Sequence, residues 1–124
     1  MFSNTQMNRQ IKFRQFVNDM WHYWGFMENG NFISPMVSQN GTYHAAMNQS
    51  GQFTNLLDRN GICIYEGDIL APQKERRGVW ECISKDGRFE LTPHGGYGTK
   101  NQAIINFKHL EIIGNIYENK NLIK

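Results

Sequence analysis

The alternation of apolar and polar residues predicts a chain built mainly from β-strands. Apolar and polar residues alternate over residues 11–17 (IKFRQFV), and Asn18 and Asp19 separate this stretch from an aromatic segment at residues 21–27 (WHYWGFM). A period of two is typical of a strand, and two such stretches joined by turn-forming residues predict an antiparallel hairpin. We therefore expect a β-hairpin over residues 11–27.

This hairpin carries more aromatic surface than two strands can bury. Strand alternation places Trp21 and Tyr23 on one face. The other face then carries Trp24 and Phe26. A two-stranded hairpin is marginal by itself, and large aromatic side chains on both of its faces need further partners. The pattern predicts either packing within the protein or a surface for self-association.

Residues 37–51 divide the chain into two predicted parts. Ser, Asn, Gln and Gly dominate this stretch, which is typical of a polar linker. From Gln52 onward, apolar runs are separated by glycine-containing turns, the pattern of a small antiparallel barrel or sandwich. The expected strands are residues 52–57, 62–71, 78–84, 88–92 and 110–117. We predict a strand-rich extension with a polar linker over residues 1–51, and a barrel domain with little helix over residues 52–124.

The segment LLDRNGICIYEGDILAP sets a glycine between two acidic residues. Glu66 and Asp68 could act as a general acid and base if both side chains pointed to one face of a regular strand. Gly67 argues against a regular strand, because a residue without Cβ adopts backbone angles closed to others and lets a strand bend. Asp68 can also accept hydrogen bonds from nearby amides. We interpret the three residues as a structural corner and not as a catalytic pair.

Turn chemistry also explains the residues around Gly61. Asp58 and Asn60 are typical turn residues, and the glycine supplies positive φ. A calcium loop would need more oxygen ligands at defined spacing, and none are visible. The four histidines and the two cysteines show no zinc-finger spacing. Cys63 and Cys82 lie in apolar runs, so we expect reduced, buried thiols, and we expect no metal and no cofactor.

Composition constrains the function only weakly. Thirteen Lys and Arg against eleven Asp and Glu give a formal charge of +2, too little by itself to imply a polyanionic partner. No apolar run approaches the ~20 residues of a membrane span, and no basic and apolar leader is visible, so we expect a cytoplasmic protein outside the membrane. No residues stand at catalytic spacing, so we expect neither an enzyme nor a small-molecule substrate.

A basic loop is the strongest candidate for a binding site. Lys74, Arg76 and Arg77 lie in the loop between two predicted strands, and Trp80 and Tyr97 are aromatic residues that could lie beside it. Cationic side chains contact phosphates and aromatic rings stack on bases, so this set predicts a nucleic-acid site. The alternative to a binding site is a solvated loop tip, whose positive charge is reduced by Glu75. The glycine-rich segment HGGYGTK lacks P-loop spacing, and we interpret it as a surface loop.

Five motifs spread over the chain share one resemblance. They are residues 11–14 (IKFR), 23–26 (YWGF), 32–35 (FISP), 52–70 (QFTNLLDRNGICIYEGDIL) and 112–119 (IIGNIYEN). Together they resemble the YopX family, a group of small proteins encoded by phages and prophages. Asn55, Leu57 and Cys63 depart from the family pattern, but none of them lies in the glycine turns. The signature residues are Asp58, Asn60, Gly61, Tyr65, Glu66, Gly67, Asp68, Gly114, Asn115 and Tyr117.

The resemblance implies an SH3-like β-barrel preceded by a strand-rich segment, in a family without an assigned biochemical activity. We predict a non-enzymatic protein-interaction or assembly module that acts in the bacterial cytoplasm during phage or prophage life. Its expected partner is another protein or a second copy of the chain. The alternative function is a nucleic-acid-binding accessory protein that uses the basic loop and its aromatic neighbours.

Overall fold

The computed structural model of the chain describes residues 9–36, 50–106 and 108–123. The chain divides into two compact units after Asn55. The sequence pattern placed this boundary after Gly51, and the predicted polar linker lies mostly outside the described residues. Strand pairing explains the later division, because Ser50, Gly51 and Gln52 pair with the first strand of the N-terminal unit.

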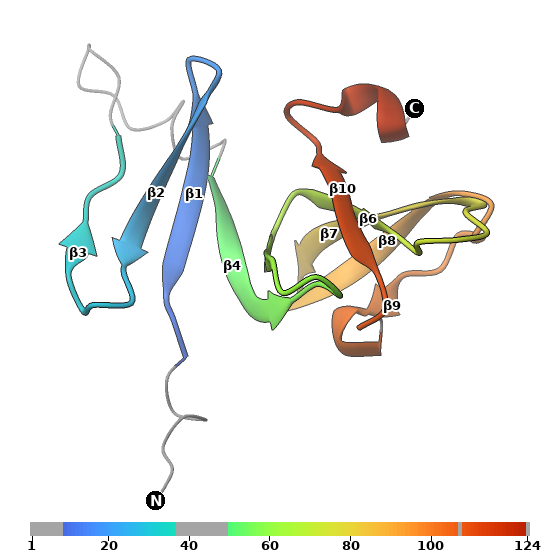
Figure 1. Cartoon of the computed structure of the whole chain (residues 1–124), viewed down its shortest axis with the longest axis horizontal. Coiled ribbons are helices and arrows are strands. Elements are labelled where there is room, and N and C mark those ends of the chain that lie inside the picture. Colours follow the sequence, from blue (N-terminus) through green and yellow to red (C-terminus); the bar gives the residue numbers. More distant parts are fainter. Residues whose placement is uncertain (1–8, 37–49, 107, 124) are drawn as a thin grey trace, which may run out of the picture. The chain divides into compact units, whose positions relative to one another are not determined.

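The N-terminal unit contains the expected hairpin and extends it (Figure 1). Its strands are β1 (Lys12–Val17), β2 (Met20–Phe26), the short β3 (Phe32–Ile33) and β4 (Ser50–Leu57), which crosses the division of the chain. They belong to an antiparallel sheet in the order β3-β2-β1-β4-β5, in which β5 (Cys63–Tyr65) follows β4 in the sequence. Asn18 and Asp19 form the β1–β2 turn with φ of 53° and 61°, the backbone that a two-residue hairpin turn requires.

Gly25 allows β2 to approach β1 closely. Its φ is 103°, and a Cβ at this position would lie 2.7 Å from the carbonyl oxygen of Ile11 and 2.9 Å from Cα of Lys12. No other residue type fits such a position without moving backbone atoms. The glycine of the YWGF motif is therefore a packing requirement of the hairpin.

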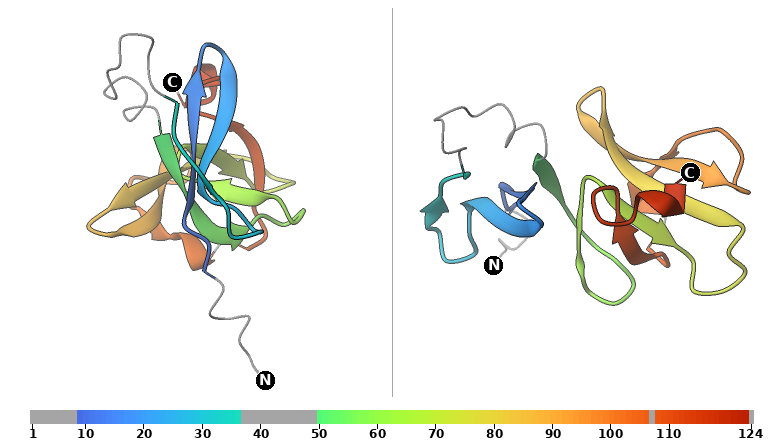
Figure 2. Two further views of the ribbon diagram at one scale, coloured as in Figure 1. Left: turned by 90° about the vertical axis from the view of Figure 1, so that its left-hand side faces the viewer. Right: turned by 90° about the horizontal axis from the view of Figure 1, so that it is seen from above.

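The C-terminal unit is built on a second antiparallel sheet. This unit also contains β5, which belongs to the first sheet. The elements that follow β5 are β6 (Asp68–Ala71), β7 (Gly78–Lys85), β8 (Arg88–Gly95), β9 (Gln102–Ala103), the 3₁₀ turn η2 (Ile104–Asn106), β10 (Glu111–Asn115) and the 3₁₀ turn η3 (Lys120–Ile123). The strand order of the second sheet is β10-β6-β7-β8-β9. Figure 2 shows the long β7–β8 hairpin, coloured yellow to orange, from two directions.

Strand alternation supplies apolar side chains to both faces of this sheet. One cluster contains Ile64, Leu70, Trp80, Cys82, Leu91 and Leu110. The opposite cluster contains Ile69, Ala71 and Val79, with Ile113, Ile116, Leu122 and Ile123 packed against it. Neighbouring residues on β6 therefore belong to different clusters, as the period of two requires. Cys82 is buried as expected, whereas Cys63 is only partly buried.

The structure is mainly β, with two antiparallel sheets, and differs in detail from the expected barrel. Both sheets are open within the described residues, so no closed barrel is seen there. The single bent strand expected over residues 62–71 is two strands, β5 and β6, that belong to different sheets. The last strand ends at Asn115 and not at Tyr117.

Helix is limited in the described residues to the two short 3₁₀ turns. None of the described helices is long and apolar enough to cross a membrane.

Candidate functional site

The turn at Asp58 joins two segments of the C-terminal unit. Its carboxylate is buried and accepts hydrogen bonds from three backbone amides: those of Asn60 (2.8 Å), Ile62 (2.9 Å) and Ile112 (3.0 Å). The amide of Gly61, whose φ is 80°, donates to the carbonyl of Asp58 (3.0 Å). These contacts use both carboxylate oxygens, so the group holds the turn against β10.

The Glu66–Gly67 turn is a corner at which the chain leaves one sheet and enters the other. Gly67 has a φ of 95°, its amide donates to the carbonyl of Cys82 (2.8 Å), and its carbonyl accepts from Ile116 (2.9 Å). Asp68 is 2% exposed, and its Oδ2 accepts a hydrogen bond from the amide of Tyr65 (2.7 Å). A buried carboxylate that holds backbone is a structural group, and Asp68 does not face solvent together with Glu66.

A third corner follows β10. The Oδ1 atom of Asn115 accepts hydrogen bonds from the amides of Tyr117 (3.0 Å) and Glu118 (2.9 Å). The amide of Asn115 donates to Oδ1 of Asn119 (3.1 Å). A Cβ on Gly114 would lie 2.5 Å from that same oxygen. The glycine therefore leaves room for the side chain that closes the turn, and these signature residues are structural.

Among the described residues, no cluster of three or more His, Cys, Asp or Glu side chains could hold a metal ion. His94 contacts Glu81 (Nε2 to Oε1, 2.9 Å) on the neighbouring strand. His44 lies outside the described residues, and His109 lies at a different site, described next.

Four of the five predicted binding residues line one pocket of the C-terminal unit. This pocket, hereafter the basic pocket, has a volume of about 360 Å³ and is lined by Pro72, Lys74, Glu75, Arg77, Trp80, Tyr97, His109 and Leu110. The rings of Trp80 and Tyr97 are stacked, with centroids 5.2 Å apart and planes at 18°. Sequence reasoning missed His109 and Leu110, because nothing in their local spacing shows that the segment before β10 returns to this loop.

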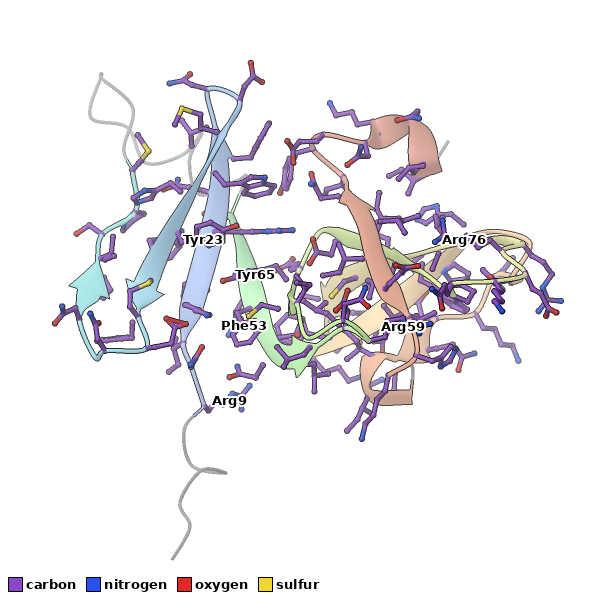
Figure 3. The ribbon with its side chains drawn as sticks, viewed as in Figure 1. Arg9, Tyr23, Phe53, Arg59, Tyr65 and Arg76 are labelled. Carbon is purple, nitrogen blue, oxygen red and sulfur yellow. The ribbon has the colours of Figure 1, made fainter. Side chains whose placement is uncertain are left out.

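Arg76 does not belong to the basic pocket. Its Nη2 donates to Oε1 of Glu111 (2.9 Å), and its Nε donates to the carbonyl of Pro72 (2.7 Å). Figure 3 labels this side chain on the loop that follows β6. Arg76 therefore ties the loop to β10, and its charge is offset by a carboxylate.

Close packing explains Gly95 and Gly96 of the HGGYGTK segment, whereas a Cβ on Gly98 would meet open space. A Cβ on Gly78 would lie 2.4 Å from the carbonyl oxygen of His94, and a Cβ on Gly96 would lie 2.4 Å from that of Arg77. The amide of Gly96 donates to the Arg77 carbonyl (2.7 Å). The segment was expected to be a surface loop, but its first two residues, through Gly95, belong to β8. The glycines let the two chain segments approach where the basic pocket begins.

A second site lies in the N-terminal unit. Seven large apolar side chains are exposed on or beside β2 and β3, and two of them are Met20 (69%) and Met36 (43%). The other five, hereafter the apolar surface, are Ile11 (52%), Tyr23 (45%), Phe26 (52%), Phe32 (55%) and Ile33 (40%). The rings of Phe26 and Phe32 are in contact, with centroids 5.2 Å apart. The aromatic residues singled out from the sequence separate here, because Trp21 and Trp24 are partly buried against β1.

A pocket of about 420 Å³ adjoins the apolar surface. Its lining residues are Arg9, Gln10, Ile11, Phe26, Met27, Glu28 and Gly30. Glu28 accepts a hydrogen bond from Nζ of Lys12 (2.6 Å), which holds the pKa of that carboxyl below its ordinary value. Figure 3 shows Arg9 at the start of the described N-terminal segment. Sequence reasoning missed Ile11 and Phe32 as surface residues, since an alternating pattern does not show which face of a strand is covered.

Comparisons with known proteins address the fold and the family. A comparison with curated proteins gives no match. Among solved structures, the chain is similar to protein EF1440 from Enterococcus faecalis, with a TM-score of 0.52 and 24% sequence identity over 92% of this chain and 98% of the other. That likeness concerns the fold alone. The model of the YopX protein family matches residues 12–124, and the chain therefore belongs to this family.

Proposed function

We propose that this member of the YopX family is a non-enzymatic interaction or assembly module, encoded by a phage or prophage and active in the bacterial cytoplasm. The observation that supports it is the apolar surface. Seven of the ten large apolar side chains exposed among the described residues lie between Ile11 and Met36. Exposed apolar side chains gathered in one region mark interaction sites more often than scattered ones do.

The apolar surface has the size of an interface core. Strand alternation puts Phe26 and Phe32 on one face of the sheet and Tyr23 and Ile33 on the other. If the exposed part of each of the five side chains presents about 100 Å², the two faces together offer roughly 500 Å² of apolar area to a partner that covers both. A stable interface takes about 800 Å² from each partner, of which somewhat more than half is apolar. The apolar surface and a polar rim would therefore suffice for a standard interface.

The partner we propose is a second copy of the chain. Among the described strands, β3 lies at the edge of its sheet. Its two residues, Phe32 and Ile33, point to opposite faces because successive strand residues alternate. Exposed apolar groups on both faces of one edge are covered when another strand is added to that edge. Two β3 edges related by a twofold axis are self-complementary, so one surface serves both copies.

Light scattering during size-exclusion chromatography tests this assembly. We expect a concentration-dependent mass that rises from 14.5 kDa toward twice that value. Replacing Phe26 and Phe32 together by serine should leave a folded monomer. Ile105→Ser is the matched control, since Ile105 is equally exposed (59%) but lies in η2 of the other unit. A wild-type chain that stays monomeric at high concentration, or a serine variant that still assembles, contradicts the proposal.

The C-terminal unit is proposed to be SH3-like at the level of topology. Three consecutive strands, β6, β7 and β8, pair as an antiparallel meander, and β10 returns to pair with β6. A meander whose last strand returns to the first is the step that brings a small barrel close to closure. An experimental structure of the full chain tests this directly.

Nucleic-acid binding is the second candidate function, and the basic pocket favours it. Lys74 and Arg77 line this pocket together with Trp80 and Tyr97. Fluorescence anisotropy with labelled DNA and RNA across a salt titration tests this function, because the release of counterions makes such binding fall steeply with salt. Binding to none of the probes would leave protein interaction as the only proposed function.

A further inference from the structure

We infer that the basic pocket binds one unpaired nucleotide, with the base against the ring of Tyr97, which Trp80 supports, and the phosphate at Lys74 and Arg77. This inference deepens the second candidate function and rests on it. The ligand chemistry is a planar base joined to a phosphate. It has two possible sources, a free mononucleotide or an unpaired nucleotide of a single strand.

The aromatic pair is fixed in place before any ligand arrives. Trp80 is 6% exposed on β7, and Tyr97 is partly buried and stacked on it. The hydroxyl of Tyr97 accepts a hydrogen bond from the amide of Arg77 (3.2 Å). A ring that is held by packing and by a hydrogen bond loses little entropy on binding a ligand. Base stacking on such a ring is tolerant of sequence because every base has a π face.

The charge of the pocket matches one phosphate. Lys74 and Arg77 have no ion pair with any described residue, and the Arg77 guanidinium lies 5.4 Å from the ring centroid of Tyr97. Glu75 is the one carboxylate in the lining, so the two cations leave an excess of one positive charge. Arg76 contributes nothing to this excess because Glu111 offsets it. An anion of low charge fits such a site better than a long polyanion does.

The size of the pocket favours a single nucleotide over a longer stretch of nucleic acid. A volume of about 360 Å³ lies near the lower end of small-molecule sites. The stacking faces of bases inside a duplex are covered by their neighbours, so a ring in a pocket reaches only unpaired bases. We therefore expect discrimination between single strands and duplexes, which a purely electrostatic surface would not give.

Competition binding on the full chain tests this inference. The probe is a fluorescein-labelled single-stranded ten-nucleotide DNA, read by anisotropy, and the competitors are AMP, inorganic phosphate and the matching duplex. We expect AMP to displace the probe, and phosphate and duplex to compete at least tenfold more weakly. Isothermal calorimetry with AMP alone tests the free nucleotide as a source. Heat of binding there shows that a free nucleotide is a ligand. Its absence, together with displacement of the labelled strand by a second unlabelled strand, assigns the binding to single strands.

Variants decide whether binding occurs in this pocket. Tyr97→Ala should weaken binding of the probe about 5- to 160-fold, the range for loss of one stacked base. Tyr97→Phe keeps the ring and should stay within about threefold of the wild type. Lys74→Ala with Arg77→Ala should weaken binding and flatten its salt dependence. Lys85→Ala is the matched control, because Lys85 is an exposed lysine at the opposite end of β7.

The outcomes separate this inference from the function on which it rests. Probe binding that is insensitive to Tyr97→Ala, or that a duplex displaces as well as a single strand does, overturns the pocket while nucleic-acid binding stands. No binding of any probe overturns both. Loss of binding in Tyr97→Ala supports the pocket when Tyr97→Phe and Tyr97→Ala unfold at similar temperatures, as measured by circular dichroism.

Discussion

Replacing Asp58 tests how the C-terminal unit is held together. The carboxylate accepts three backbone hydrogen bonds, and the bond from Ile112 joins residues 54 positions apart in the sequence. Asp58→Ala removes both acceptor oxygens, and with them all three hydrogen bonds, from a site that is 7% exposed. Water can reach the amides of Asn60 and Ile62, which belong to exposed residues, but it reaches the amide of Ile112 less easily. The loss should therefore come mainly from the long-range bond.

The magnitude follows from these three bonds. A hydrogen bond to a charged group contributes about 1.5–3 kcal/mol, and the two turn bonds contribute less because water replaces them in part. We expect Asp58→Ala to lower the free energy of unfolding by about 3 kcal/mol. In a unit of this size, 1 kcal/mol shifts Tm by about 4–8 °C, so the expected loss is roughly 12–24 °C.

Thermal unfolding followed by circular dichroism measures this loss. Asp58→Asn keeps one acceptor oxygen and should cost about half as much as the alanine variant. Asp86→Asn is the control, since Asp86 is also an aspartate in a tight turn, with φ of 53°, but is exposed. That control should stay within about 0.5 kcal/mol of the wild type. The reasoning fails if Asp58→Ala melts within about 2–4 °C (about 0.5 kcal/mol) of Asp86→Asn.

Three further predictions concern the other corners and the pH dependence. Gly67→Val should cost at least about 2 kcal/mol, because a branched residue is strained at a φ of 95°. Gly114→Ala should cost about 1–3 kcal/mol, because its Cβ would lie 2.5 Å from Oδ1 of Asn119. The pKa of Glu90 is held below its ordinary value, chiefly by a hydrogen bond from Asn101, so its stabilising effect is present at neutral pH and is lost as the pH falls through the acidic range. Thermal melts between pH 7 and pH 3 should therefore show a smaller acid-induced loss for Glu90→Gln than for the wild type.

Each of these three predictions has its own control. Gly98→Val imposes similar strain, at a φ of 88°, where the added atom meets open space, so it should cost less than the change at Gly67. Asn119→Ala should relieve part of the clash from Gly114→Ala, and additive losses in the double variant would contradict the contact. Equal acid sensitivity of Glu90→Gln and wild type would show that this carboxyl does not couple folding to pH.

Much of the fold was predictable because strand alternation and turn chemistry act locally. The hairpin around Asn18 and Asp19 follows from a period of two on either side of turn residues. The exchange of sheets at Gly67 was not predictable, because an apolar run interrupted by glycine does not show whether one strand bends or two strands separate. The division of the chain depends in the same way on the pairing of β4 with β1, which is a contact between distant residues.

The candidate sites were predictable only in part, for the same reason. Lys74, Arg77 and Trp80 are close in the sequence, so their grouping follows from one loop and the strand after it. Tyr97 joins them because β8 pairs back on β7, which the hairpin pattern predicts. The pairing of Arg76 with Glu111 depends on the return of β10, and no local pattern reveals it.

The positions that carry the family resemblance in the C-terminal unit are used for folding. Asp58, Asp68 and Asn115 bond backbone amides, and the nearby glycines permit positive φ or a close approach. Side chains that make these hydrogen bonds are buried or bonded to backbone, so they present few hydrogen-bonding atoms to a ligand. A match to the family therefore establishes architecture, and the proposed binding functions are assigned to side chains outside these corners. The apolar surface and the basic pocket meet that condition, because their exposed side chains can be changed without disturbing a corner.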